Sequence, residues 1–142
     1  MTIKRFEDIE GWQMARNLCQ EIFRISSQTT LDRDYGLKDQ MSGSSGSIMD
    51  NIAEGFDSGT NPEFIRFLQY SKRSCSELQS QLYRCLDRGH ITVETFDPLY
   101  ASAASTRGKI GAFIQYLSSN PRPVSTMKAR HAQKPRTENR EL

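Results

Sequence analysis

Side chains able to do acid–base, nucleophilic or metal chemistry are few in this chain of 142 residues, and they are scattered. The two histidines, His90 and His131, have no second histidine or cysteine at the spacing of a metal-binding motif. Glu54 and Glu77 could meet in space, but di-iron helical bundles also need Glu-x-x-His elements, which this chain lacks. The three cysteines form no CxxC pair, so reduced core thiols are the favoured interpretation. We therefore expect no enzyme and no bound metal or organic cofactor.

One group of basic and aromatic residues could bind a ligand. In the segment that we predict below as the third helix, four arginines would lie within about 40–60° of one another at 100° per residue, with two tyrosines between them. The candidate nucleic-acid-binding residues of this group are Arg66, Tyr70, Arg73, Tyr83, Arg84 and Arg88. Arginine can hold phosphates, and tyrosine can stack on bases. A solvated helix face, in which Glu77 can pair with Arg73, is the favoured alternative.

The end of the chain differs in charge from the rest. Residues 119–142 carry 6 Lys and Arg against 2 Asp and Glu, a net charge of +4, whereas residues 1–118 carry 13 against 15, a net charge of −2. Because this segment has almost no apolar residues, we predict a disordered basic tail. Its two basic clusters, Lys128 with Arg130 and Lys134 with Arg136, are further candidates for sequence-independent phosphate contacts. A solubilising extension would explain the same composition.

Four helices are predicted before the tail, because apolar residues recur there every three or four positions. The expected helices span 8–27 and 35–55, the second of them capped by Asp34. A third segment begins at the cap Asn61 and ends at Gly89, and a fourth begins at the cap Thr92 and ends before Pro121. The predicted core residues of the first helix are Trp12, Ala15, Cys19, Ile22 and Ser26, with Leu18, Phe23 and Ile25 beside them. Those of the third helix are Phe64, Leu68, Ser71, Cys75, Leu78, Leu82 and Cys85. Residues 1–118 should therefore form an all-α, antiparallel, up-down-up-down four-helix bundle, followed by the tail at 119–142.

The run Ser42-Gly43-Ser44-Ser45-Gly46-Ser47 has the composition of a flexible linker. Leu37, Met41, Ile48 and Ile52 nevertheless keep a helical period through it, which predicts the second helix. Glycine costs a helix about 1 kcal/mol relative to alanine, so packing must offset the two glycines. A second stripe, Ser42, Gly46, Met49 and Ala53, would let another backbone approach closely, and we predict an oligomer interface there. A surface that happens to be small and polar is the alternative.

Several stretches together resemble the bacterial four-helix-bundle family that includes proteins encoded in intervening sequences of large-subunit ribosomal RNA genes. They are FEDIEGWQMAR at 6–16, YGLKDQM at 35–41, SIMDNIAEGF at 47–56, EFIRFLQYSKRSCSELQSQL at 63–82 and DRGHI at 87–91. The most specific part is Asn51, Ile52, Ala53, Glu54, Gly55 and Phe56 followed by EFIRFL at 63–68. On this signature, Asn51 and Glu54 are expected to tie the second helix to a neighbour by hydrogen bonds.

The resemblance implies an antiparallel bundle that assembles into a ring, typically a homopentamer. A related branch includes basic accessory proteins of diversity-generating retroelements, which work with a reverse transcriptase and its RNA. This chain departs from the family in one respect, because Ser42-Gly43 stands where the second helix usually carries two basic residues. That departure weakens any transfer of RNA binding to this helix.

The sequence thus predicts a non-enzymatic, ring-forming protein that binds RNA or a ribonucleoprotein partner. The alternative is a scaffold for protein–protein interaction that binds no nucleic acid, which suits the acidic bundle. No apolar run approaches the roughly 20 residues of a membrane span, and the first residues lack a hydrophobic signal core. We therefore expect a cytoplasmic protein without a membrane partner.

Overall fold

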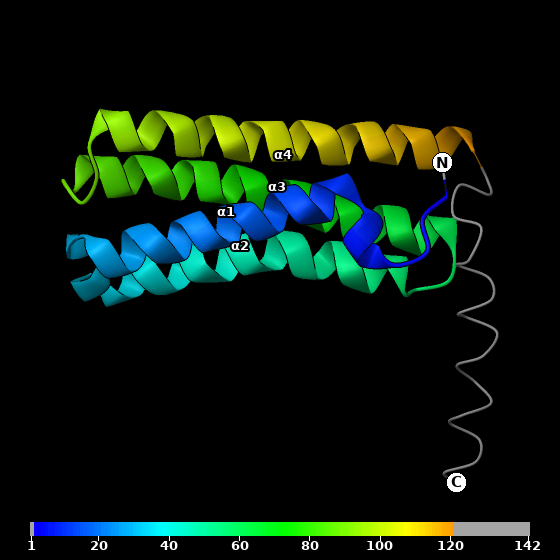
Figure 1. The fold of residues 1–142 in the computed structure, drawn as a ribbon, viewed down its shortest axis with the longest axis horizontal. Helices are drawn as coiled ribbons and strands as arrows, with labels where there is room; N and C mark the ends of the chain where they lie inside the picture. The colour runs from blue at the N-terminus through cyan, green and yellow to red at the C-terminus, as the bar shows by residue number, and fades with distance from the viewer. Residues whose placement is uncertain (1, 121–142) are drawn as a thin grey trace, which may run out of the picture.

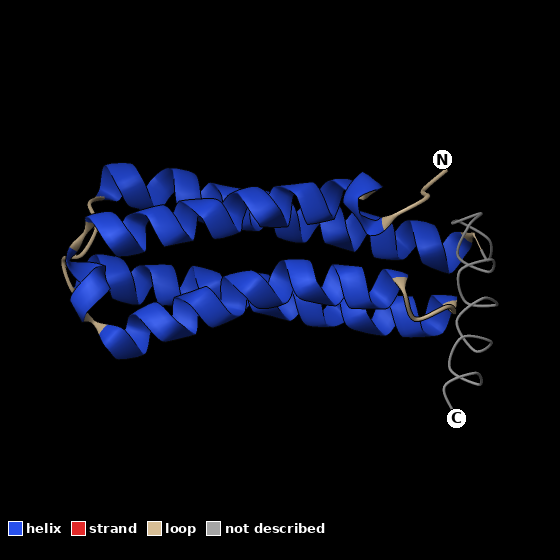
Figure 2. Ribbon diagram, turned by 60° about the horizontal axis from the view of Figure 1, so that its bottom comes forward, coloured by secondary structure: helices blue, strands red, loops and turns tan. Residues whose placement is uncertain are grey.

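The computed structural model describes residues 2–120, and this part of the chain is built of helices with no strand. The long helices are α1 (Glu10–Gln28), α2 (Tyr35–Phe56), α3 (Asn61–Asp87) and α4 (Val93–Ser119), and the short 3₁₀ turns are η1 (Phe6–Asp8) and η2 (Thr30–Arg33). Figure 2 shows that only short loops join them. The predicted all-α bundle is confirmed. The predicted tail, with Lys128, Arg130, Lys134 and Arg136, lies outside the described residues apart from its first two positions.

The four long helices lie side by side, and each runs opposite to the one before it (Figure 1). The start of the described chain and the end of α4 therefore lie at the same end of the bundle. Helix α1 packs against α2 and α4, and α3 packs against α2 and α4. The helices thus form a ring in chain order. As a result, the seam between α1 and α2 lies on the opposite side from the seam between α3 and α4.

The periodic stripes predicted from the sequence form the core. All seven predicted core residues of α3 are buried, from Phe64 to Cys85, as are Ile48 and Ile52 of α2. The prediction is wrong for Phe23, whose side chain is 74% exposed. At 100° per residue, Phe23 lies about 100° from its buried neighbour Ile22, so it falls outside the stripe.

Side-chain caps define where the helices begin. Asp34 Oδ1 accepts a hydrogen bond from Leu37 N at 3.5 Å, and Thr92 Oγ1 accepts one from Thr95 N at 3.3 Å, as expected for caps. For α3 the predicted cap is wrong. Thr60 is the capping residue, whereas Asn61 begins the helix and donates from Nδ2 to Leu117 O at 3.3 Å. Asn61 therefore links the start of α3 to the end of α4.

The glycine- and serine-rich run is the middle of α2, as predicted, and its small side chains let α1 and α3 approach closely. Ser44 and Ser45 are buried. Ser44 Oγ donates a hydrogen bond to the Gln81 side chain on α3, and Cys19 Sγ on α1 donates to Ser45 O at 3.0 Å. Ser71 Oγ on α3 donates to Ile48 O of α2 at 2.8 Å. Short polar side chains thus fill this contact, and they donate to backbone carbonyls and to Gln81 across it. Apolar side chains of greater volume would hold the helices further apart.

Gly55 marks a close approach of α2 to α3. A Cβ atom at this position would lie 2.8 Å from Phe64 Cδ1 and 2.8 Å from Phe67 Cβ. The Phe67 Cβ atom is fixed to the α3 backbone, so the clash cannot be relieved by a rotation of the side chain. Phe56 packs edge-on against Phe64, with 6.2 Å between ring centroids. The glycine of the family signature therefore has a packing role within one chain.

Gly55→Ala should therefore lower the free energy of unfolding, because overpacking of a tight contact costs about 1–3 kcal/mol. Gly108→Ala is the matched control. It lies on α4, where an added Cβ would meet nothing within 4 Å. That substitution should raise stability by up to about 1 kcal/mol through helix propensity. Urea unfolding followed by circular dichroism measures both, and a Gly55→Ala protein as stable as Gly108→Ala would contradict the packing argument.

Candidate nucleic-acid interface

The predicted arginine and tyrosine group on α3 divides into three parts. In the first part, Arg66 and Arg73 both lie against the ring of Tyr70, with guanidinium carbons 6.0 and 5.6 Å from its centroid. Arg66 also pairs with Glu63 at 3.0 Å. The suggested pair of Arg73 with Glu77 is not formed among the described residues. Arg73 therefore keeps its charge unpaired beside an aromatic ring.

The second part, Arg84 and Arg88, turns toward α2. Arg84 Nη1 donates to Gln40 Oε1 at 2.7 Å, and Arg88 Nη1 donates to Asp34 Oδ2 at 2.9 Å. The Arg88 contact is an ion pair, whereas the Arg84 contact is to a neutral amide. Both arginines help to hold the end of the bundle together, so they are weaker candidates for binding an outside phosphate.

The third part, Tyr83, turns the other way, toward α4. Its ring centroid lies 4.9 Å from that of Phe96 and 5.5 Å from that of Tyr100. The prediction that Tyr83 lies between the arginines is therefore wrong. At 100° per residue it lies about 100° from Arg84 around the helix, which places it on the α3–α4 seam.

A groove on the α3–α4 seam brings together three cations. Lys72 and Arg73 from α3 and Arg107 from α4 line a cavity of about 410 Å³, together with Gln69 and Ser76. None of these three cations forms an ion pair within residues 2–120. Like charges held together without counter-ions repel one another, so the groove favours an anion. We call these five residues the basic groove.

Sequence reasoning missed Lys72 and Arg107. Lys72 directly precedes Arg73 on α3, whereas Arg107 lies beside the predicted arginine group only because α3 and α4 pack as antiparallel neighbours. The position of Arg107 at the edge of the core could have been inferred from the sequence, because it directly follows Thr106, which is buried in α4. A search for basic residues flanking the core on adjacent helices would have found the groove.

Three acidic residues lie away from this groove, on α2. On α2, Asp39, Asp50 and Glu54 are exposed, and none forms an ion pair in the described part of the chain. Helix α2 lies diagonally across the ring from α4. The net charge of −2 over residues 1–118 therefore hides a separation of charge, with a basic α3–α4 seam and an acidic outer face of α2.

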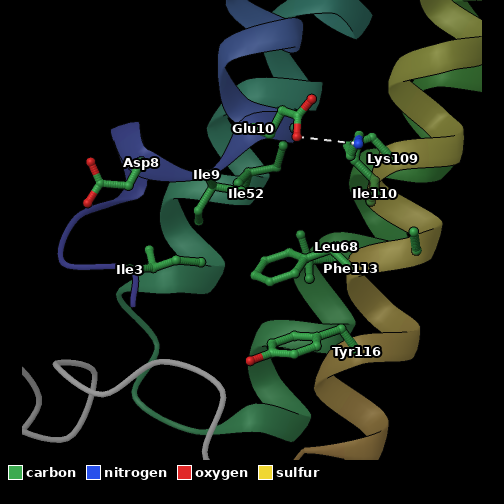
Figure 3. Close-up of a pocket in the computed structure, with 12 residues that line it drawn as sticks. Ile3, Asp8, Ile9, Glu10, Ile52, Leu68, Lys109, Ile110, Phe113 and Tyr116 are labelled. Atoms are coloured by element: carbon green, nitrogen blue, oxygen red, sulfur yellow. Dashed lines mark ion pairs between the residues drawn. The ribbon is translucent and has the colours of Figure 1, made fainter. Parts of the chain in front are cut away.

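A second cavity, between α1 and α4, is apolar (Figure 3). It has a volume of about 350 Å³ and is lined by side chains from every long helix, including Ile52, Leu68 and Phe113. At its rim, Glu10 pairs with Lys109 at 3.3 Å. Exposed pairs of this kind contribute little to stability, about 0–1 kcal/mol. The cavity offers no convergent set of acid, base and nucleophile.

His90, for which the sequence offers no local metal-binding or catalytic motif, joins two distant segments. Its Nε2 lies 2.8 Å from Asp34 Oδ2, and its Nδ1 lies 2.7 Å from Thr30 Oγ1. Hydrogen bonds from His90 and Arg88 lower the pKa of Asp34 to about 2. A hydroxyl, an imidazole and a carboxylate in this order resemble a catalytic triad. Here, however, the carboxylate also binds Arg88 and caps α2, so the network closes the end of the bundle.

The cysteines are free, and two of them are buried. Burial raises the pKa of Cys75 to about 12 and that of Cys85 to about 11, so both thiols are protonated and unreactive at neutral pH. No group of three metal-ligating side chains occurs within residues 2–120. In the same range, no helix is long and apolar enough to cross a membrane.

The predicted interface and signature residues lie along α2. Ser42 is exposed, whereas Gly46, Met49 and Ala53 are half-buried. Within the signature, Ile52, Gly55 and Phe56 are buried.

The two polar signature residues behave differently. Asn51 Nδ2 donates to Ser47 O at 2.8 Å and to Ser47 Oγ at 2.9 Å, and that hydroxyl accepts from Ser74 Oγ on α3 at 3.0 Å. Asn51 thus bonds within α2 and reaches α3 only through the Ser47 hydroxyl, so the direct tie expected of it is not formed among residues 2–120. Glu54 makes no hydrogen bond in the same range, so the tie expected of it is also not formed there.

Comparison with known proteins agrees with the fold. The model of the 23S rRNA-intervening sequence protein family matches residues 7–112. The chain belongs to this family. A crystal structure of a protein with unknown function from the S23 ribosomal protein family of Bacteroides thetaiotaomicron is similar to it, with a TM-score of 0.69 and 16% identity. The match covers 74% of this chain and 98% of that one, and at this identity it establishes the fold alone. No curated protein matches the chain.

The free energy of unfolding should depend on pH through the hydrogen bonds of Asp34 with Arg88 and His90. Because the pKa of Asp34 falls from 3.8 to about 2 on folding, its ionised form stabilises the bundle above pH 4, and this contribution is lost as the pH falls from about 4 to about 2. Asp34→Asn keeps a good helix cap but loses the charge that faces Arg88 and His90. The urea midpoint of Asp34→Asn should be lower than that of the wild type at pH 7, and the two should converge as the pH falls to about 2.

Asp39→Asn is the control, because Asp39 is exposed on the same helix. It should leave the urea midpoint close to that of the wild type at every pH. A difference between wild type and Asp34→Asn that stayed constant from pH 7 to pH 2.5 would show that the charge of Asp34 is not involved.

Proposed function

We propose that this protein is a non-enzymatic RNA-binding protein that holds phosphates in the basic groove. The observation that supports this most is the convergence of Lys72, Arg73 and Arg107, from two helices, without ion-pair partners in the described part of the chain. Unpaired cations on a rigid surface bind a polyanion by releasing its counter-ions. Helices also hold these side chains more precisely than a loop would.

The remainder of the groove suits the same ligand. Gln69 and Ser76 carry neutral hydrogen-bond donors of the kind that contact phosphate oxygens. Arg73 belongs both to the groove and to the group around Tyr70, so Arg66 extends the basic surface along α3. The family description names ribosomal RNA, which also favours RNA or a ribonucleoprotein as the partner. The basic residues beyond residue 120 would add contacts that do not depend on sequence.

Charge reversal in the groove tests this function. Lys72→Glu with Arg107→Glu should weaken binding of a labelled RNA at least tenfold in moderate salt and flatten the dependence of affinity on salt, because phosphate contacts are lost. The matched control is Arg24→Glu with Arg33→Glu, which changes the charge equally on α1 and η2. Fluorescence anisotropy measures the affinity. Equal losses in both proteins, or none, would contradict binding in the groove.

We also propose that the chain assembles with copies of itself through the α1–α2 seam. An added Cβ at Gly46 would meet nothing within 4 Å, so folding of a single chain does not require glycine there. Beside it lies a groove of about 360 Å³, lined in part by Cys19 and Ser42, and the exposed Phe23 borders it. A neighbouring copy would cover the Phe23 side chain and pack into the open space beside Gly46. The α3–α4 seam lies on the opposite side, so assembly would leave it accessible and present several grooves to one RNA.

Gly46→Leu tests the assembly. An added Cβ at Gly46 meets nothing in a single chain, so the fold should persist. A close contact between copies would be overpacked, at a cost of about 1–3 kcal/mol. Light scattering should show an oligomer for the wild type and a smaller species for Gly46→Leu. Gly43→Leu is the control, because that position also has open space but lies outside the predicted stripe. A wild-type protein with the mass of one chain at micromolar concentration would exclude the assembly.

A protein-interaction scaffold is the second candidate function. The exposed ring of Phe23 and the acidic outer face of α2 favour it. It would replace the RNA proposal if the full-length protein bound no RNA even at low salt, where electrostatic attachment is strongest.

A further inference from the structure

An exposed aromatic surface continues the basic groove along the α3–α4 seam. Tyr83 follows Ser76 by seven residues on α3, and Tyr100 precedes Arg107 by seven residues on α4. Because the two helices are antiparallel, both steps lead toward the same end of the bundle. Seven residues of helix span about 10 Å. The tyrosines therefore lie about two helical turns from the cations, on the same side of the molecule.

The ring of Tyr83 is held in place but is not covered. It packs on Phe96, which is buried, and Phe96 in turn stacks on Tyr100 with 5.3 Å between centroids. Tyr83 remains 49% exposed, the largest exposure of any ring in this cluster. An aromatic side chain fixed from below and open above is suited to stacking on a nucleobase, which has a π-face whatever its sequence.

The two ends of the α3–α4 seam differ in charge. Tyr100 and partial burial raise the pKa of Tyr83, as does the nearby carboxylate of Asp97, so the Tyr83 hydroxyl is neutral at physiological pH. Asp97 would repel a phosphate from the aromatic end, whereas Lys72 and Arg107 attract one to the other end. The Asp97 carboxylate can also accept a hydrogen bond from the amino group of a base.

We infer that the α3–α4 seam is a site for single-stranded nucleic acid, with a phosphate in the basic groove and an unpaired base stacked on Tyr83. This inference rests on the proposed function. A duplex keeps its base faces stacked inside, so it can offer phosphates to the groove but no base to the ring. The seam therefore distinguishes a single strand from a duplex, and it does so without reading the base sequence.

The test uses the full-length protein and four labelled probes of one length: a single-stranded RNA, the same strand as DNA, the RNA duplex, and a single strand with abasic sugars. The single-stranded RNA should bind at least fivefold more tightly than the duplex and the abasic strand, as expected from the loss of one stacked base. DNA should bind like RNA, because neither the groove nor the ring reads the 2′-hydroxyl.

Substitution of the ring provides the second measurement. Tyr83→Leu should lose at least fivefold in affinity for single-stranded RNA but bind the duplex and the abasic strand as the wild type does. Tyr83→Phe keeps the ring and should retain the preference, which separates stacking from any change in stability. Tyr35→Leu, another exposed tyrosine, on α2, is the control and should have no effect.

The outcomes separate the inference from the function on which it rests. Equal binding of all probes, failure of DNA to bind, or an unchanged affinity in Tyr83→Leu would overturn the single-strand site, while the loss caused by Lys72→Glu with Arg107→Glu would still support phosphate binding. Absence of binding to every probe would overturn both. Competition by polyglutamate as effective as that by single-stranded RNA would show that the groove takes acidic polypeptide instead.

Discussion

The close packing of α2 on α3 is the constraint on which the rest of the bundle depends. Small residues make it possible: Gly55 leaves no space for a methyl group beside Phe67, and Ser44 bonds directly to the side chain of Gln81. Glycine and serine are poor helix formers on their own, so this stretch of α2 is stable only while it is packed against its neighbours. The family signature at the end of α2 therefore specifies how two helices meet, and this role requires no catalytic chemistry.

Because one side of α3 packs against α2, the other side packs against α4. That other side presents Lys72 and Tyr83 to the seam, where Arg107 and Tyr100 meet them from α4. Three exposed carboxylates that form no ion pair within residues 2–120 lie on α2, diagonally opposite α4 in the bundle: Asp39, Asp50 and Glu54. A slightly acidic bundle can therefore carry a strongly basic groove, because binding depends on the local arrangement of charge and not on the net charge.

Much of this fold could be predicted from the sequence, because burial imposes a period that survives even in a run of glycine and serine. The stripe from Phe64 to Cys85 is buried throughout, and Asp34 and Thr92 cap their helices as expected. The candidate site was predicted less well. Angles on one helix say nothing about the neighbouring helix, so Arg107 was missed. Tyr83 was grouped with the wrong side chains although its angle on α3, about 100° from Arg84, already separates the two. The network of His90 with Asp34 joins residues 56 positions apart, which no local motif could reveal.

The central claim is that RNA contacts the seam between α3 and α4. Ultraviolet cross-linking of the full-length protein to a single-stranded RNA, followed by mass spectrometry of the linked peptides, locates that contact directly. Cross-links are expected at Tyr83 or Tyr100 and in the peptides that contain Lys72 and Arg107, with none on α1. Cross-links confined to α1, α2 or the residues beyond 120 would contradict the claim.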